Sequence, residues 1–259
     1  MSPPKVEAAL VADIPVIFAR PETTKSGGRL ALWMHFLGGS KEAMVPFLLR
    51  LAEAGVTAVS LDAWQHGQRT DESLDQLMNR AFGQFRRNVW PILGHTTLDA
   101  MRVLDWAVDR FQPAELVAGG VSMGGDVSVA LAGIDDRIRR VAAMIATPDW
   151  TRPGMTALDD AETVIDQGEP TAYGQWMFDH LDPMTHLGSF ARAPAITFQL
   201  GGNDLHINQE NAVKFKAALA GAYPDAAAEV HIRVNPGLDH LGAGRDRGVE
   251  DACLDWLLR

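Results

Sequence analysis

Cysteine and clustered positive charge are both scarce in this 259-residue chain. The single cysteine, Cys253, has no partner for a disulfide within the chain, so we expect a packed thiol. The formal net charge is −10 at pH 7, whereas nonspecific binding to nucleic acid or to anionic membranes requires clustered positive charge. The composition therefore predicts no nucleic-acid partner and no membrane partner.

Long apolar runs are also missing. No segment approaches the roughly 18 uninterrupted apolar residues that a membrane-spanning helix needs. Asp13 and Pro15 interrupt the apolar stretch near the N-terminus, so we expect no signal peptide. These features predict a cytoplasmic protein, and they favour no particular oligomeric state.

Apolar residues are plentiful, at 47% of the composition, and they occur in alternating segments. Continuously apolar, strand-like runs alternate with segments of helical length and periodicity. This order predicts a mostly parallel central sheet with helices on both faces, in a single α/β domain over residues 1–259. The predicted strands lie within 7–21 and at 29–35, 56–62, 115–121, 139–147, 194–202 and 228–235, and the predicted helices at 41–55, 97–111, from about 123, 208–220 and 246–258.

Two connections are longer than this alternation requires. Residues 69–94 join a strand to a helix, and residues 148–193 separate two strands. Connections of this length are rarely without structure in a compact domain. Helical patterns at 158–165 and 173–180 predict that the second connection is a small helical cap inserted between two strands.

One serine stands among four glycines in "GGVSMGGD", residues 119–126. Glycine costs about 1 kcal/mol in a helix interior, so the cluster needs a reason. The stretch lies between a strand-like run and a helix-like run, which predicts a tight strand-to-helix turn that exposes Ser122 above the sheet. Gly120 and Gly124 then avoid clashes with neighbouring backbone. We predict that Ser122 is a nucleophile on this elbow, the alternative being a purely structural glycine turn.

Phosphate and metal sites lack the residues that they usually need. The spacing of Gly119 and Gly124 matches a P-loop, but Gly125 and Asp126 stand where a P-loop requires Lys and Ser or Thr. Neither an H-E-x-x-H motif nor paired C-x-x-C motifs occur. We therefore predict no catalytic metal.

A serine becomes a nucleophile only when a base takes its proton and a third group orients that base. Asp204 in "QLGGNDLHI" and His240 in "NPGLDHLGAG" both follow strand-like runs, at the sheet edge where the elbow opens. They are the predicted acid and base. His206 remains an alternative base, and Asp149 an alternative acid.

The stretch "WMHFLGGSKE", residues 33–42, is expected to supply one donor of an oxyanion hole. The backbone N–H groups of Leu37 and Met123 are the candidates, and an ordinary turn at Gly38 and Gly39 is the alternative. An apolar pocket wall is also expected from aromatic residues in loops and in the cap, with core packing as the alternative for each. These residues are Phe36, Trp64, Trp90, Trp150, Trp176 and Phe178.

With these motifs the sequence resembles the α/β-hydrolase superfamily, and within it small serine esterases similar to dienelactone hydrolases and prolyl oligopeptidases. The resemblance runs in order through "HFLGGSKE", "LDAWQHGQR", "GVSMGG", "LGGND" and "LDH". It implies an acyl-enzyme on Ser122, a triad completed by Asp204 and His240, and no cofactor. Phe36 departs from the family's usual His-Gly-Phe-Gly-Gly, and the serine replaces the cysteine of true dienelactone hydrolases.

The sequence thus predicts a carboxylesterase that acts on a small or medium apolar ester. A peptidase, thioesterase or acyltransferase would use the same three side chains. A non-catalytic ligand-binding protein would keep the scaffold without the reaction, because fold alone does not determine function.

Overall fold

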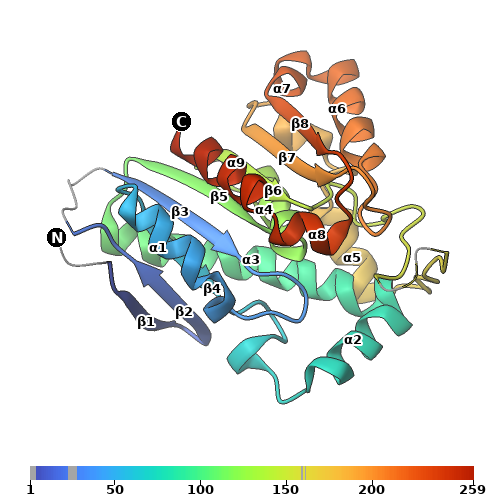
Figure 1. The fold of residues 1–259 in the computed structure, drawn as a ribbon, viewed down its shortest axis with the longest axis horizontal. Helices are drawn as coiled ribbons and strands as arrows, with labels where there is room; N and C mark the ends of the chain where they lie inside the picture. The colour runs from blue at the N-terminus through green and yellow to red at the C-terminus, as the bar shows by residue number, and fades with distance from the viewer. Residues whose placement is uncertain (1–3, 23–27, 159, 161) are drawn as a thin grey trace.

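The computed structural model describes residues 4–22, 28–158, 160 and 162–259. Within them one sheet contains β1 (Val6–Val11), β2 (Ile14–Ala19), β3 (Arg29–Met34), β4 (Thr57–Leu61), β5 (Glu115–Val121), β6 (Ile138–Met144), β7 (Ala195–Gly201) and β8 (Val230–Asn235). Its strand order is β1-β2-β4-β3-β5-β6-β7-β8 (Figure 1). β2 pairs antiparallel with β1 and β4, and the other pairs are parallel. The predicted mostly parallel sheet is confirmed.

The central strands are continuously apolar because both of their faces are covered. Every residue of β4 and β7 is buried, whereas the edge strands β1 and β8 are largely exposed or half-buried. β5 spans the predicted residues 115–121. β6 ends at Met144, before the predicted end at 147.

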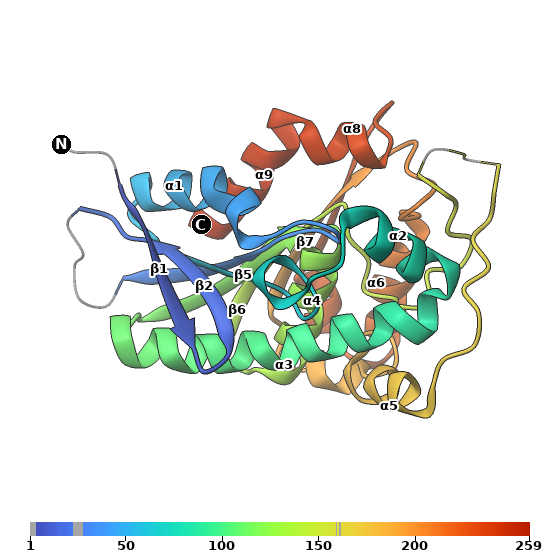
Figure 2. The same cartoon turned by 90° about the horizontal axis from the view of Figure 1, so that it is seen from below.

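Helices cover both faces of the sheet, as predicted. Figure 2 shows α1 and α9 on one face and α3, α4 and α6 on the other, and the two buried apolar clusters divide in the same way. Among the described residues, no helix combines the length and apolar character needed to cross a bilayer. The helices are α1 (Val45–Glu53), α2 (Leu74–Gly83), α3 (Phe85–Phe111), α4 (Met123–Ile134), α5 (Ala172–Leu181), α6 (Glu210–Ala222), α7 (Pro224–Ala228), α8 (His240–Arg245) and α9 (Arg247–Leu258).

Helix α3 begins at Phe85, well before the predicted start at residue 97. Pro91 and Gly94 lie inside it, and both lower helix propensity in a local reading of the sequence. The tertiary contact with α5 explains why the helix nevertheless continues. A Cβ on Gly94 would lie 2.5 Å from the sulfur of Met177, so the two helices approach closely there (Figure 2). Packing outweighs propensity at this point.

The segment between β6 and β7 contains α5 and a 3₁₀ helix at Leu187–Phe190. The predicted helix at 173–180 lies within α5. The predicted helical pattern at 158–165 is not a helix in the described residues, where Thr156 and Val164 form an isolated antiparallel bridge. Residues 159 and 161 of that pattern lie outside the described part of the chain. The α5 portion packs beside α3.

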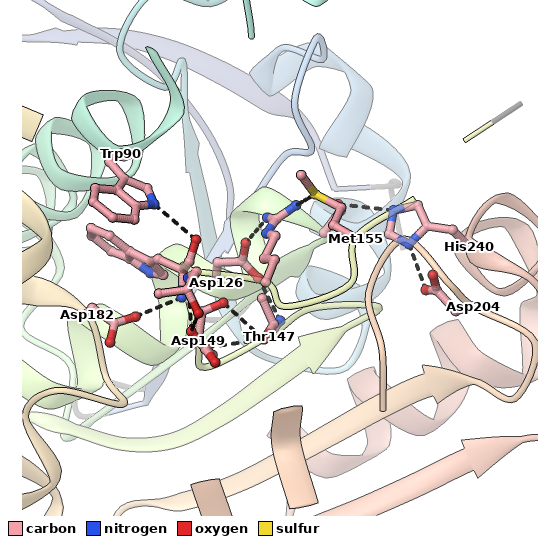
Figure 3. Close-up of polar contacts among 12 residues, drawn as sticks. Trp90, Asp126, Thr147, Asp149, Met155, Asp182, Asp204 and His240 are labelled. Atoms are coloured by element: carbon pink, nitrogen blue, oxygen red, sulfur yellow. Dashed lines mark hydrogen bonds and ion pairs between the residues drawn. The ribbon is translucent and has the colours of Figure 1, made fainter. Parts of the chain in front are cut away.

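A buried carboxyl group ties the start of this segment to the end of α5. Asp182 is fully buried and accepts a hydrogen bond from the backbone N–H group of Trp150 at 2.8 Å (Figure 3). It also accepts one from the backbone N–H group of Thr185 at 2.9 Å. The indole of Trp90 donates to the carbonyl of Trp150 at 3.0 Å. Burial, assisted by the nearby charge of Asp149, raises the pKa of Asp182 to about 7. The backbone hydrogen bonds lower this pKa, but by less than burial raises it.

The stability of the fold should contain a component that falls as pH rises from about 4 to 7. The pKa of Asp182 is about 7 in the folded chain against an ordinary 3.8, so over that interval the folded state binds more protons and ionisation opposes folding. The slope from one group is at most about 1.4 kcal/mol per pH unit. Asp182→Asn should remove this component in urea unfolding followed across pH.

Asp179→Asn changes an exposed carboxylate in α5, three residues before Asp182, and serves as the matched control. It should leave the pH dependence as in the wild type. If Asp182→Asn and Asp179→Asn give the same slope, the raised pKa of Asp182 is contradicted.

Candidate active site

Ser122 stands between the end of β5 and the start of α4 in a backbone conformation that few side-chain-bearing residues adopt. Its φ is 52° and its ψ is −117°. Such strain costs on the order of 1–3 kcal/mol and persists only where the surroundings enforce it. The Ser122 N–H donates to the carbonyl of Met144 at 2.8 Å, and its carbonyl accepts from Gly125 at 2.8 Å and Asp126 at 3.0 Å. These bonds hold the elbow at the carboxyl edge of the sheet.

The glycines around the serine are required by close backbone contacts. A Cβ on Gly124 would lie 2.3 Å from the carbonyl oxygen of Met34, and one on Gly120 would lie 2.5 Å from the backbone of Gly124. Gly119 lies against the ring of Trp33, and a Cβ on Gly119 would lie 2.5 Å from that ring. The glycine cluster therefore lets β3, β5 and α4 converge beneath the hydroxyl.

The structure brings Ser122, His240 and Asp204 into one hydrogen-bonded chain. Ser122 Oγ lies 3.2 Å from His240 Nε2. His240 Nδ1 lies 2.7 Å from Asp204 Oδ2 (Figure 3). All three residues are buried. Asp204 Oδ1 accepts backbone hydrogen bonds from His206, at 3.0 Å, and Ile207, at 2.7 Å, which orient the carboxylate. An Nδ1–H donated to Asp204 leaves His240 Nε2 free to accept the serine proton.

Asp149 and His206, the alternative acid and base, make hydrogen bonds to residues other than His240 and Ser122. Asp149 accepts from the backbone and the hydroxyl of Thr151, at 2.9 and 2.5 Å, and in the described chain it bonds to no histidine. His206 directs Nδ1 to the carbonyl of Thr156 at 2.8 Å rather than to Ser122. Its ring packs on that of His240 at a centroid distance of 4.9 Å.

The loop after β3 is held by a buried, neutral histidine. His35 Nε2 accepts from the Ala63 N–H at 3.0 Å, so its Nδ1 carries the proton and donates to the carbonyl of Phe36 at 2.8 Å. Burial lowers the pKa of His35 despite that second bond. The Gly39 N–H donates to the same Phe36 carbonyl at 2.9 Å. The next residue after Phe36, Leu37, thereby faces the cavity beside Ser122.

A largely apolar cavity of about 360 Å³ opens at Ser122, His240, Leu37 and Met123. Much of its apolar lining comes from two directions: the α1 side and the α2–α3 side of the carboxyl edge. The α1 side supplies Ala43, Met44 and Phe47, and the α2–α3 side supplies Leu74, Met78, Phe82, Phe85 and Val89. An apolar acyl group fits such a lining.

The aromatic pocket wall predicted from the sequence needs correction. Phe36 lines the cavity, but five of the predicted aromatic residues do not: Trp64, Trp90, Trp150, Trp176 and Phe178. Trp90 and Phe178 stack on each other at 4.3 Å, because the early start of α3 places Trp90 against α5. Trp150 is fully buried in the core, and Trp176 is half exposed and stacks on His180. Trp64 stacks on His95 instead.

Sequence reasoning missed the part of the wall that α2 supplies. Leu74, Met78 and Phe82 follow one another at intervals of four residues, which is the spacing of one helix face. Because the residues between these three are mostly polar, the segment does not stand out as an apolar run in the sequence. A Cβ on Gly38 would lie 2.6 Å from Leu74, so α2 also packs directly on the loop after β3.

A buried ion pair reaches the cavity through one of its two side chains. Arg152 lines the cavity and pairs with Asp126 in the first turn of α4. Asp126 also accepts from the Thr147 N–H at 2.7 Å. Burial raises the pKa of Asp126, while the charge of Arg152 and these hydrogen bonds oppose the shift. In the described residues, no cluster of three or more His, Cys, Asp or Glu is arranged to hold a metal.

Residues 83–259 match the model of the prolyl oligopeptidase family. The chain belongs to this family. It is therefore a serine hydrolase with the α/β-hydrolase fold that the sequence resembles. No curated protein sequence matches it.

Solved structures show the same fold at low sequence identity. The Thermus thermophilus protein TT1662 has a TM-score of 0.77 and 22% identity, covering 99% of this chain and 97% of its own. A putative dienelactone hydrolase from Klebsiella pneumoniae has a TM-score of 0.70 and 16% identity, covering 100% of both chains. A prolyl endopeptidase has a TM-score of 0.69 and 16% identity over 100% of this chain, which spans 38% of that longer protein.

Gly124→Ala should destabilise the fold even though alanine favours a helix by about 1 kcal/mol. The added methyl group would meet the Met34 carbonyl at 2.3 Å, and overpacking costs about 1–3 kcal/mol. The atoms that the methyl group would meet, in Met34 and His35, belong to the backbone and cannot move aside easily. We therefore expect a net loss of stability, measured as a lower urea midpoint of unfolding. Gly221→Ala in α6, with nothing within 4 Å, should be neutral or slightly stabilising. Equal midpoints for the two variants would show that the elbow can shift without cost.

Proposed function

We propose that the chain is a carboxylesterase that hydrolyses small or medium apolar esters through an acyl-enzyme on Ser122. One observation carries the proposal: the hydrogen-bonded chain of Ser122, His240 and Asp204 opens into an apolar cavity of about 360 Å³. A serine hydroxyl, an oriented imidazole and a buried carboxylate form the set that acyl transfer requires.

In acylation, His240 Nε2 takes the proton of Ser122 as Oγ attacks the carbonyl carbon of the ester. Asp204 stabilises the imidazolium that forms. The tetrahedral intermediate collapses when His240 returns the proton to the departing alcohol oxygen. Water then attacks the acyl-enzyme and gives its proton to His240, and Ser122 recovers a proton as the acid product leaves.

The negative charge on the substrate oxygen needs donors that are already in place. The backbone N–H groups of Leu37 and Met123 are the proposed pair. Met123 is the first residue of α4, whose first N–H groups have no acceptor within the helix, and the positive end of the helix dipole lies there. Leu37 lines the same cavity on the loop held by His35.

The acyl group is proposed to lie between the α1 side and α2, where each buried methylene contributes about 0.8 kcal/mol. Residues 148–193 are proposed to act as a small cap within a single domain. Arg152 and Leu158 are the cap residues that line the cavity.

A peptidase is the second candidate, because the family takes its name from a peptidase and one similar structure is a prolyl endopeptidase. Both reactions would use the same three side chains. Nitrophenyl esters, prolyl peptide amides and acyl thioesters, assayed side by side, separate the two functions. Hydrolysis of esters without cleavage of amides supports the esterase. Cleavage of the prolyl amides supports the peptidase, since acyl transfer to serine that breaks an amide also breaks an activated ester.

Ser122→Ala should lower kcat for a nitrophenyl ester by a factor on the order of 10⁴–10⁶, with the fold intact. His240→Ala should match it, because the members of a triad act as a unit. Asp204→Asn should be severe but milder. Asp149→Asn is the control and should remain close to wild type, since Asp149 bonds Thr151 rather than His240. More than a tenth of wild-type turnover in Ser122→Ala, or a crippled Asp149→Asn, would contradict the assignment.

The acyl-chain preference should depend on the residues that line the cavity. Phe36→Gly and Met78→Ala both remove volume from its lining, so each should shift the optimum toward longer chains. Trp176→Ala is the control, because that half-exposed ring stacks on His180 away from the cavity. The measurement is kcat/KM for acetyl, butyryl, octanoyl and palmitoyl nitrophenyl esters. A wild-type optimum at the palmitoyl ester, or the same chain-length profile in all variants, would show that Phe36 and Met78 do not limit the length of the acyl chain.

A further inference from the structure

His206 is a buried imidazole in the wall of the cavity that the proposed reaction does not use. It is 5% exposed and lines the cavity next to Ser122 and His240. Its ring packs edge-to-face with the rings of His240 and Phe82, at centroid distances of 4.9 and 5.6 Å. Since Phe82 belongs to the wall proposed for the acyl group, His206 lies on the acyl side of the site.

The hydrogen bonds of His206 determine which ring nitrogen carries its proton. Nδ1 lies 2.8 Å from the carbonyl oxygen of Thr156, and a carbonyl can only accept, so Nδ1 is protonated. The Thr156 N–H in turn donates to the carbonyl of Leu205 at 3.1 Å, which holds this arrangement from both sides. Nε2 is therefore left with a lone pair, as an acceptor.

This acceptor stays available over the whole range in which an esterase works. Burial, together with the positive charges of Arg152 and of His240 when protonated, lowers the pKa of His206 to about 3. In the part of the chain that the structure describes, no donor bonds to Nε2. Nε2 is not one of the enclosed side-chain atoms that lack a partner, so it stays open to the cavity. A bound substrate that excludes water must therefore supply a donor, or leave this acceptor unpaired at a cost in binding.

The other polar groups of the cavity do not duplicate this role. Ser122 and His240 are committed to each other, and Arg152 is a donor that pairs with Asp126. Arg245, at the exposed part of the lining, is also a donor. The acyl side of the cavity thus combines an apolar wall with a fixed acceptor.

We propose that His206 Nε2 accepts a hydrogen bond from a hydroxyl or amide N–H carried by the acyl group near the scissile carbonyl. The preferred substrates are then esters of hydroxy acids or of N-acylated amino acids rather than plain alkanoates. This inference rests on the proposed esterase function. A site built around a buried polar group discriminates strongly against an analogue that lacks the matching group.

Two matched pairs of nitrophenyl esters test it and distinguish the two sources of the donor. The 3-hydroxybutyrate ester is compared with the butyrate ester, and the N-acetylglycine ester with the N-acetylsarcosine ester, which lacks the N–H. Spontaneous hydrolysis is subtracted for each. Wild-type kcat/KM should favour the donor-bearing member of at least one pair by about tenfold, the value of one good hydrogen bond.

Two substitutions separate recognition from support of the fold. Asn in His206→Asn can replace Nδ1 as the donor to Thr156, but its side chain is too short to place an acceptor where Nε2 lies. Gln in His206→Gln reaches that position with its amide oxygen. The ratio within the favoured pair should fall to near one in His206→Asn and be partly restored in His206→Gln. Thermal unfolding checks that both variants are folded.

The outcomes distinguish failure of this inference from failure of the proposed esterase function. Wild-type ratios near one in both pairs overturn the inference while ester hydrolysis stands, and this result needs no variant to fold. A ratio unchanged in His206→Asn, with all esters slowed alike, also overturns it and makes His206 a structural residue. If the wild type hydrolyses none of the four esters, the proposed function itself is wrong and the inference falls with it.

Discussion

The close contact between Gly124 and the carbonyl of Met34 sets the geometry on which the rest of the site depends. Met34 ends β3 and Gly124 lies in the first turn of α4, so the loop after β3 and the serine elbow meet without a side chain between them. In the proposed mechanism that loop carries Leu37 and that elbow carries Ser122. The nucleophile and an oxyanion donor are thus positioned by one backbone contact, which leaves little to reorganise during the reaction.

Buried charge holds the neighbouring loops in the same region. Asp62, just after β4, is fully buried and accepts from Lys41 through its backbone N–H, at 3.0 Å, and its ammonium, at 2.7 Å. Desolvation opposes the charge of Lys41, but hydrogen bonds to Asp62 and Glu42 outweigh it and raise its pKa. Desolvation largely cancels the attraction within such a pair, so its net stabilisation is small. Its effect is positional: it ties the loop after β3 to the loop that leads into α2.

Features encoded by a local pattern could be predicted from the sequence, and features created by distant contacts could not. β5 and the elbow follow from a continuous apolar run and from glycine spacing, and the chain order of Ser122, Asp204 and His240 anticipates the side chains that the fold brings together. The start of α3 depends on α5, about eighty residues later, which overrides Pro91 and Gly94. The same contact draws predicted pocket aromatics into the helix interface. An aromatic side chain carries no local mark that separates core from pocket.

In the proposed mechanism, the ion pair of Arg152 and Asp126 bears on the positive charge that His240 acquires. An isolated guanidinium in this apolar cavity would oppose the imidazolium that His240 must form, just as its field contributes to lowering the pKa of His206. Asp126 compensates that field from within the same buried pair, and Asp204 compensates the imidazolium directly. In the transition state the four side chains are together neutral, so the oxyanion is the one charge that no ionic side chain compensates. The backbone donors at the elbow and the loop after β3 are then required to stabilise only that one charge.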